Sequence, residues 1–286
     1  MKYFLFLALF GSALSFTEPA QAVRIEQALE NAWIDLEVYG NPESTHYLKP
    51  IIVAITNSSD RRLEVTIPAG QTFLAKDPTV QDVIVTEETL IALDPGKTTQ
   101  LPLYAMCIEP SNSGLNEGIT YSLGPMGDQD LVELATVIGE RKDHNIIGQN
   151  AIWALVDEGD LGMISGIDTT AVEFYRYHVA GIRDIPVPEF DPEDYQTNYH
   201  DTGLIKRSAK GSFKYKFAKT SHVSIALFDE NGIVVRELYD NPAEAPGHHE
   251  FDFQFDMEVY QDDVYYVRMI QDQTIQIEFK MATNRG

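Results

Sequence analysis

The stretch that decides the fold is residues 211–281, which holds the segments KYKF (214–217), HVSIALFDENGIVVREL (222–238), APGHHEFDFQF (245–255) and DDVYYVRMIQDQTIQIEFKM (262–281). Apolar and polar residues alternate along these segments, and Val, Ile, Tyr and Phe are frequent, as in half-buried β-strands. Gly, Pro, Asn and Asp stand between the segments, and these residues favour turns. The stretch therefore predicts β-strands joined by turns.

Four short motifs in this stretch carry a family resemblance. They are the turn from Asp229 to Gly232, the run Val234-Val235-Arg236, the turn Pro246-Gly247-His248, and the pair Tyr265-Tyr266. Together they resemble the immunoglobulin-like β-sandwich of flagellar hook-capping proteins and of the C-terminal sorting domains of type IX secretion cargo. The resemblance implies a targeting or assembly module, with the secretion machinery as a possible partner at the C-terminus. An immunoglobulin-like module that stays attached is the alternative.

The N-terminus has the pattern of an export signal. Lys2 precedes an apolar run over 4–14, and Ala20-Gln21-Ala22 is a small-x-small cleavage pattern. The apolar run is shorter than the roughly 20 residues that a membrane-spanning helix needs. We therefore predict a signal peptide over 1–22 and a mature protein that is secreted, on the cell surface or in the periplasm.

Composition narrows the partners. The chain of 286 residues has a formal net charge of −23, and the predicted signal peptide contains one base and one acid, so its removal leaves this charge unchanged. Nucleic acids and anionic membranes attract clustered Lys and Arg, so both are disfavoured as partners. An unidentified protein or a surface glycan remains, and no metal or other cofactor is predicted. Cys107 is the one cysteine, which excludes an intramolecular disulfide.

Residues 23–183 predict a first domain, a β-sandwich with a helical segment. Short segments rich in Val, Ile, Thr and aromatic residues recur at regular spacing, as in a sandwich. Residues 57–60 and 94–96 predict hairpin-like turns between strands. The predicted strand segments are WIDLEVYG (33–40), LKPIIVAITNSS (48–59), LEVTIPAGQTF (63–73), DVIVTEETLIALDPG (82–96) and TTQLPLYAMCIE (98–109).

After the predicted strands, from residue 128 onward, apolar residues follow the spacing of amphipathic helices. This spacing predicts a helix over 128–138 with Asp128 as its N-cap, a second over 147–156 and a third over 169–179. Residues 184–203, rich in Pro and acids, predict an extended linker, and 204–286 the C-terminal domain. The fold class is therefore mainly β: a β-sandwich with a few added helices, followed by a small immunoglobulin-like β-sandwich.

Cys107 in YAMCIEP and Gln149 in IIGQNAIWALVD are the candidate binding pair. The two fragments resemble the thioester domains of Gram-positive surface adhesins, in which a cysteine at a strand end bonds to a glutamine just before an Ala-Ile-Trp-type helix. Gly148 departs from that pattern, because a threonine is usual before the glutamine. The resemblance implies a thioester that awaits an amine or hydroxyl of a partner. Alternatively, Cys107 is a small buried apolar residue and Gln149 a side chain at a helix N-terminus.

The first domain also resembles a family of exported Bacteroidetes proteins, through ALENAWIDLEVYG, TIPAGQTFLAKDPTVQDVIVTEE, LYAMCIEP and QNAIWAL. This resemblance reinforces the domain boundary and implies no activity.

Other candidate residues are carboxylates and histidines. His248 and Glu250 alternate with His249 on a predicted strand, so these two face one side, but a structural role at a turn is the favoured interpretation. Asp35 with Glu37, or Asp82 with Glu87, would be carboxylate pairs. The sequence thus predicts a non-enzymatic interaction protein without catalytic residues. A covalent adhesin using Cys107 and Gln149 is the first alternative, and a carboxylate-dependent hydrolase the second.

Overall fold

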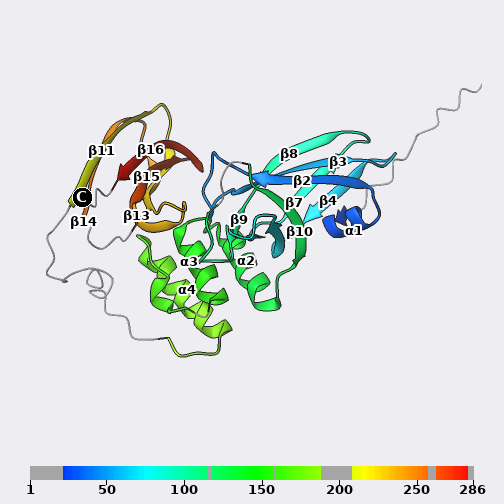
Figure 1. Ribbon diagram of the computed structural model, residues 1–286, viewed down its shortest axis with the longest axis horizontal. Helices are drawn as coiled ribbons and strands as arrows, with labels where there is room; N and C mark the ends of the chain where they lie inside the picture. The colour runs from blue at the N-terminus through cyan, green and yellow to red at the C-terminus, as the bar shows by residue number, and fades with distance from the viewer. Residues whose placement is uncertain (1–21, 115–117, 158, 188–207, 257–261, 283–286) are drawn as a thin grey trace, which may run out of the picture.

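The computed structural model describes residues 22–114, 118–157, 159–187, 208–256 and 262–282 (Figure 1). It is mainly β with a few helices, which confirms the predicted fold class. Residues 1–21 of the predicted signal peptide and 188–203 of the predicted linker lie outside the described residues. The elements of the first region are β1 (Ala22–Arg24), α1 (Ile25–Glu30), β2 (Ile34–Gly40), β3 (Ile51–Asn57), β4 (Leu63–Ile67), β5 (Gln71–Ala75), β6 (Val83–Val85), β7 (Thr89–Leu93), β8 (Thr98–Leu103), β9 (Ala105–Cys107), β10 (Thr120–Met126), α2 (Gln129–Arg141), α3 (Ile146–Val156), a 3₁₀ turn (Leu161–Met163) and α4 (Thr169–Ile182).

Two sheets form the β part of the first region. One is three-stranded, in the order β1-β4-β7, and the other seven-stranded, in the order β8-β3-β2-β10-β5-β6-β9. Along β4, Leu63, Val65 and Ile67 are buried and alternate with more exposed residues, because successive side chains of a strand point to opposite faces. These side chains share one apolar cluster with Val53 and Ile55 of β3. The two sheets are therefore layers around a common core.

The turns at 57–60 and 94–96 are not hairpins, so that prediction was wrong. Each carries the chain from one sheet to the other: β3 leads to β4, and β7 leads to β8. Asn57 joins the two crossings, because its buried side-chain amide donates to the carbonyls of Arg61 (2.8 Å) and Leu93 (2.9 Å). Its own carbonyl accepts from the Gly96 N–H at 2.9 Å. Turn residues occur at sheet crossings as well as in hairpins, so composition alone does not separate the two.

Three of the predicted strand segments divide into two strands each, β4 and β5, β6 and β7, and β8 and β9. The first break contains Gly70, whose φ of +87° lies in the left-handed region that favours glycine. A Cβ there would lie 2.6 Å from Val132 Cγ2 of α2. The break thus lets the sheet pass close under a helix.

The three predicted helices are present as α2, α3 and α4. Asp128 caps α2 as predicted, accepting from the Leu131 N–H at 2.9 Å. The buried face of α2 contains Leu131, Leu134, Ala135 and Ile138. The elements β1 and α1 were missed, since a three-residue strand and a six-residue helix give too little periodicity to recognise. The seven-residue strand β10 was missed as well.

The C-terminal region contains β11 (Ser208–Phe217), β12 (Ser221–Phe228), β13 (Val234–Glu244), β14 (Gly247–Asp256), β15 (Val264–Gln271) and β16 (Thr274–Ala282). β11 pairs with β14, and the other strands form a sheet in the order β13-β12-β15-β16. The predicted turn after β12 is present. Asp229 accepts from the N–H groups of Asn231 (2.9 Å) and Ile233 (2.8 Å), and Gly232 has a φ of +77°.

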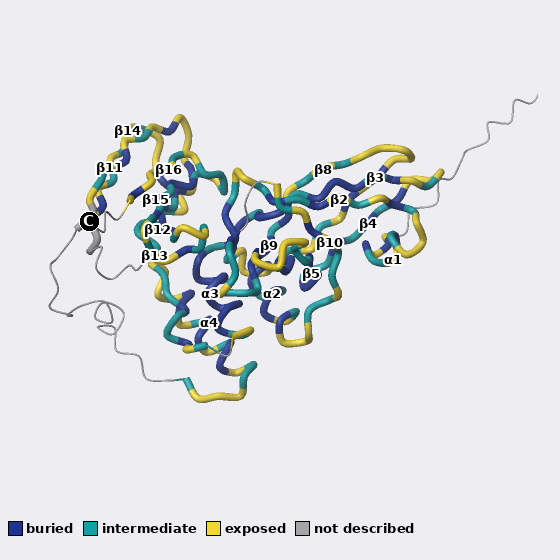
Figure 2. Tube along the Cα trace, in the orientation of Figure 1, coloured by how far each residue is buried: buried dark blue, intermediate teal, exposed yellow. Residues whose placement is uncertain are grey.

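The four-stranded sheet is covered on both faces. Val223, Ile225 and Leu227 of β12 pack with residues of β11 and β14. Ala226 and Phe228, which alternate with them, instead join the apolar cluster of the first region. Figure 2 shows buried stretches along β3 and along α3, with exposed residues on the outer loops. The C-terminal sheet is thus packed against the first region, while the predicted domain boundaries stay predictions.

Candidate functional site

Two elements position Cys107 and Gln149. Cys107 ends β9, and Gln149 lies in the first turn of α3. Asn145 fixes the start of α3, because its side-chain oxygen accepts from the N–H groups of Ile147 (2.9 Å) and Gly148 (3.1 Å). A Cβ on Gly148 would lie 2.4 Å from the Asp143 carbonyl oxygen. This close approach explains why position 148 is a glycine.

The structure brings the predicted pair together through the Cys107 backbone. The Cys107 N–H donates to Gln149 Oε1 at 3.0 Å, and Gln149 Nε2 donates to the Cys107 carbonyl at 2.7 Å. Both residues are fully buried. The carboxamide therefore pairs with β9 as a neighbouring strand would, along the edge where the backbone groups point. Because Cβ of a strand residue projects out of the sheet, these bonds orient the carboxamide toward the backbone edge.

The surroundings of Cys107 disfavour its thiolate. Burial raises the pKa of the Cys107 thiol well above its usual value, and the negative charges of Glu109 and Asp82 raise it further. The pKa of the nearby Tyr121 hydroxyl is also raised, chiefly by burial. A protonated thiol is a weak nucleophile, so the site as folded stabilises the unreacted pair.

The predicted carboxylate pairs have separate partners. Asp82 accepts from the Ala75 N–H at 2.7 Å, whereas Glu87 lies 2.9 Å from Lys142 Nζ and 3.0 Å from His144 Nε2. Asp82 and Glu87 thus flank β6 at opposite ends, and each is bound by different groups.

The second carboxylate pair is exposed on β2. Asp35 and Glu37 lie two residues apart on that strand, and Asp35 accepts a hydrogen bond from the Ser58 hydroxyl.

On β14, His249 makes structural contacts, and His248 stands opposite Lys216 in the ladder with β11. His249 Nδ1 lies 3.0 Å from Glu244 Oε1, and its ring stacks on Tyr215 at 5.3 Å between centroids. Glu250 pairs with Lys214 at 3.1 Å across the β11–β14 ladder. Within the described ranges, no three His, Cys, Asp or Glu side chains form a group able to hold a metal ion.

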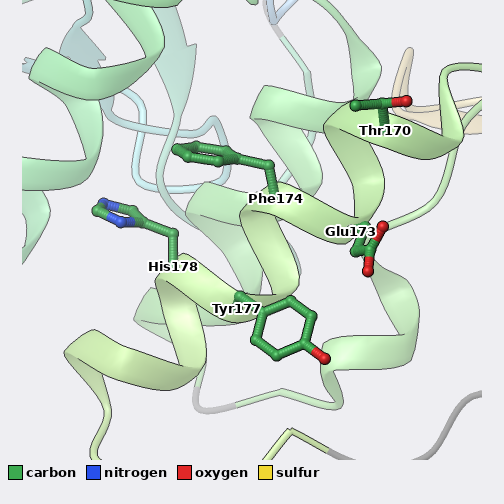
Figure 3. Close-up of a pocket in the computed structure, with 5 residues that line it drawn as sticks. All are labelled: Thr170, Glu173, Phe174, Tyr177 and His178. Atoms are coloured by element: carbon green, nitrogen blue, oxygen red, sulfur yellow. The ribbon is translucent and has the colours of Figure 1, made fainter.

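A surface groove between α2 and α4 was missed at the level of sequence. One hollow of about 500 Å³ is lined by Thr170, Glu173, Phe174, Tyr177 and His178 of α4 (Figure 3). An adjoining hollow of about 370 Å³ shares Tyr177 and His178 with the first. Its other lining residues are Asp130 and Glu133 of α2 and Gly181 and Ile182 of α4. Together we call these hollows the α2–α4 groove.

Aromatic rings and acids dominate the α2–α4 groove. Phe174 and His178 stack with 5.6 Å between ring centroids, and His178 Nε2 lies 3.7 Å from Glu133 Oε1. Tyr177 is 60 % exposed. The run Phe174-Tyr175-Arg176-Tyr177-His178 was the available signal, because a helix buries one stripe and adjacent aromatic residues cannot all lie in it.

Fold and site define a mainly β protein with a layer of helices, a buried Cys–Gln contact and an open aromatic and acidic groove. No protein-family model matches the chain, and no curated protein is detectably similar to it in sequence. None of the described helices combines the length and apolar content needed to cross a membrane.

Proposed function

We propose that the chain is an exported, non-enzymatic interaction protein whose C-terminal sheets serve targeting or assembly. The observation that carries the proposal is the packing of the C-terminal four-stranded sheet onto the first region. The resemblance of residues 211–281 to sorting and hook-capping modules supports a role in targeting or assembly. The packing favours a module that stays attached.

Aromatic rings form the centre of this packing. His46 stacks on Trp153 at 5.4 Å between centroids, and Tyr47 stacks on Phe228 at 6.4 Å. Burial lowers the pKa of His46 to about 3, so its ring is neutral and its Nδ1–H donates to the Gly232 carbonyl at 3.0 Å. Such buried ring contacts are worth about 1 kcal/mol each beyond the area they bury.

Hydrogen bonds extend the contact along the edge of the sheet. The Gly114 N–H donates to the Asn231 carbonyl at 2.7 Å, and the Ile275 N–H to the Glu43 carbonyl at 3.1 Å. The Tyr104 hydroxyl donates to Gln273 Oε1 at 2.7 Å. A module bound at several turns at once retains its orientation on the first region, as an attached assembly module requires.

The test is the mass of the protein after export. The full chain is expressed in a bacterium with a type IX secretion system, and a variant lacking residues 2–22 serves as the control. We expect the wild-type protein outside the cytoplasm with a mass that runs from Val23 to Gly286, and the control inside the cell. An uncleaved, cytoplasmic wild-type protein would contradict export, and cleavage within 184–203 would contradict an attached module.

A covalent adhesin is the second candidate, favoured by the contact between the Gln149 carboxamide and Cys107. In that reaction the Cys107 sulfur bonds to Gln149 Cδ, the C–N bond breaks, and the thiol proton leaves with the nitrogen as ammonia. An amine then forms an amide at Cδ and restores the thiol. A freshly isolated protein lighter by one ammonia, unlike Cys107→Ala, would support this candidate, and an unshifted mass would reject it.

A further inference from the structure

We infer that the α2–α4 groove binds an arginine side chain presented by a peptide segment of a partner protein. The inference rests on the proposed interaction function and names the chemistry of the partner. The groove offers an exposed ring, Tyr177, with carboxylates beside it, and both attract a guanidinium.

The molecule already contains such an arrangement next to the groove. The Arg141 guanidinium carbon lies 3.9 Å from the centroid of the Phe174 ring, and Arg141 Nε is 2.7 Å from Asp143 Oδ2. A ring face and a carboxylate thus hold one guanidinium within the chain. Tyr177, three residues further along α4, presents an aromatic ring to solvent beside Glu173 (Figure 3).

One basic side chain contacts the carboxylates of the groove, because His178 Nε2 lies 3.7 Å from Glu133 Oε1. Asp130, Glu133 and Glu173 are exposed, and none of them pairs with a Lys or Arg in the part of the chain that the structure describes. The neighbouring bases are engaged elsewhere: Lys142 with Glu87 at 2.9 Å, and Arg183 with the Gly159 carbonyl at 2.7 Å. A cation from outside therefore meets carboxylates that no Lys or Arg among the described residues pairs with.

Shape and charge favour arginine over lysine. The groove is open and shallow. Figure 3 shows the Tyr177 ring and the Glu173 carboxylate side by side on α4. A planar guanidinium stacks on a ring and donates to a carboxylate at the same time, whereas an ammonium is more strongly hydrated and acts as a point charge. A peptide is the fitting carrier, because the two adjoining hollows extend the contact beyond a single side chain.

Calorimetric titration of the mature protein tests the inference, with acetylated and amidated tri-arginine as the probe and tri-lysine for comparison. Because the chain carries a net charge of −23, both peptides experience a general attraction. The contribution of the groove to peptide binding is measured with Tyr177→Ala and with the double variant Glu133→Gln/Glu173→Gln. The matched controls are Leu90→Ala, an exposed apolar side chain on β7, and Glu30→Gln/Glu88→Gln, exposed acids outside the groove.

We expect tri-arginine to bind more tightly than tri-lysine. Tyr177→Ala is expected to weaken tri-arginine binding about threefold to fivefold, and the groove double variant to weaken it more than the control double variant does. Equal losses in groove and control variants, or no measurable tri-arginine binding, would overturn the inference. Export is measured without the peptide, so a failed titration leaves the proposed function standing, and failed export is recognised independently.

Discussion

The buried contact between Cys107 of β9 and Gln149 of α3 differs from the exposed α2–α4 groove in how its polar groups are satisfied. Gln149 uses both ends of its carboxamide on the backbone of β9 and has no exposure. In the groove, Tyr177 and the nearby carboxylates face solvent, and no Lys or Arg among the described residues pairs with these carboxylates. Residue types suited to chemistry therefore do not by themselves mark an interaction site. An interaction site is marked by side chains whose hydrogen-bonding and charged groups face solvent and have few partners within the protein.

The largest expected effect follows from removing the buried carboxamide. Gln149→Ala leaves a cavity and removes the side-chain amide that donates to the Cys107 carbonyl, so we expect a loss of about 3 kcal/mol in the free energy of unfolding. Urea unfolding measures this loss. A change below about 1 kcal/mol would show that the contact contributes no more than an ordinary hydrogen bond, and the contrast with the groove would then lose its basis.

Glycines on the two helices sharpen the contrast. Gly148 of α3 would place a Cβ 2.4 Å from the Asp143 carbonyl oxygen, whereas a Cβ on Gly181 of α4 would meet nothing within 4 Å. We expect Gly148→Ala to cost about 2 kcal/mol through overpacking. Gly181→Ala is the matched control and should stabilise by about 0.5 to 1 kcal/mol through helix propensity. Equal thermal shifts of the two variants would contradict the packing around Gln149.

The Glu237 carboxyl, at the contact between the first region and the C-terminal sheet, predicts that the free energy of unfolding depends on pH. Burial raises the pKa of Glu237 to about 7, and the nearby Asp240 and Asp168 charges add to this, although the Ile167 N–H and His222 act in the opposite direction. The hydrogen bond to Asp240 also raises the pKa of His222. Both groups hold a proton more tightly when folded, so their stabilisation is complete at low pH and is lost as the pH rises through their folded pKa values.

Unfolding free energies of wild type and Glu237→Gln, measured from pH 5 to pH 8, test this dependence. The amide oxygen can still accept from the Ile167 N–H, so the variant keeps the contact and loses the titration. We expect the fall in stability toward pH 8 to be about 1.5 kcal/mol smaller in the variant, less than a full conversion of the shift because the side chain is partly exposed. Parallel pH profiles would place Glu237 in a more solvated setting.

The smallest expected effect on stability belongs to the groove. Tyr177 is exposed, so Tyr177→Ala should change the free energy of unfolding by less than about 0.5 kcal/mol. The same urea experiment used for Gln149→Ala measures it. A loss as large as that of the buried variant would mean that Tyr177 is part of the packing and not a free surface.

The sequence predicted the fold class and the helices, because periodicity and caps such as Asp128 are local signals. A resemblance offered Cys107 and Gln149 as a candidate pair, with separate structural roles as the alternative. The bonding of the carboxamide to the Cys107 backbone was not predictable, since no local pattern tells which atoms a buried carboxamide meets. The sheet crossings at 57–60 and 94–96 were predicted as hairpins, because strand pairing depends on distant segments. The hollow between α2 and α4 was missed because these two helices are separated in sequence. The hollow on α4 alone had a local signal, the aromatic run 174–178, which was not used.

The most direct measurement is two-dimensional ¹H–¹⁵N NMR of the mature protein titrated with the tri-arginine peptide. The account predicts saturable shifts concentrated in α2 and α4, with little change at Cys107 and in β9. Shifts spread over the acidic surface, or centred on β9 and α3, would contradict the view that the exposed groove, and not the buried pair, is where this protein meets a partner.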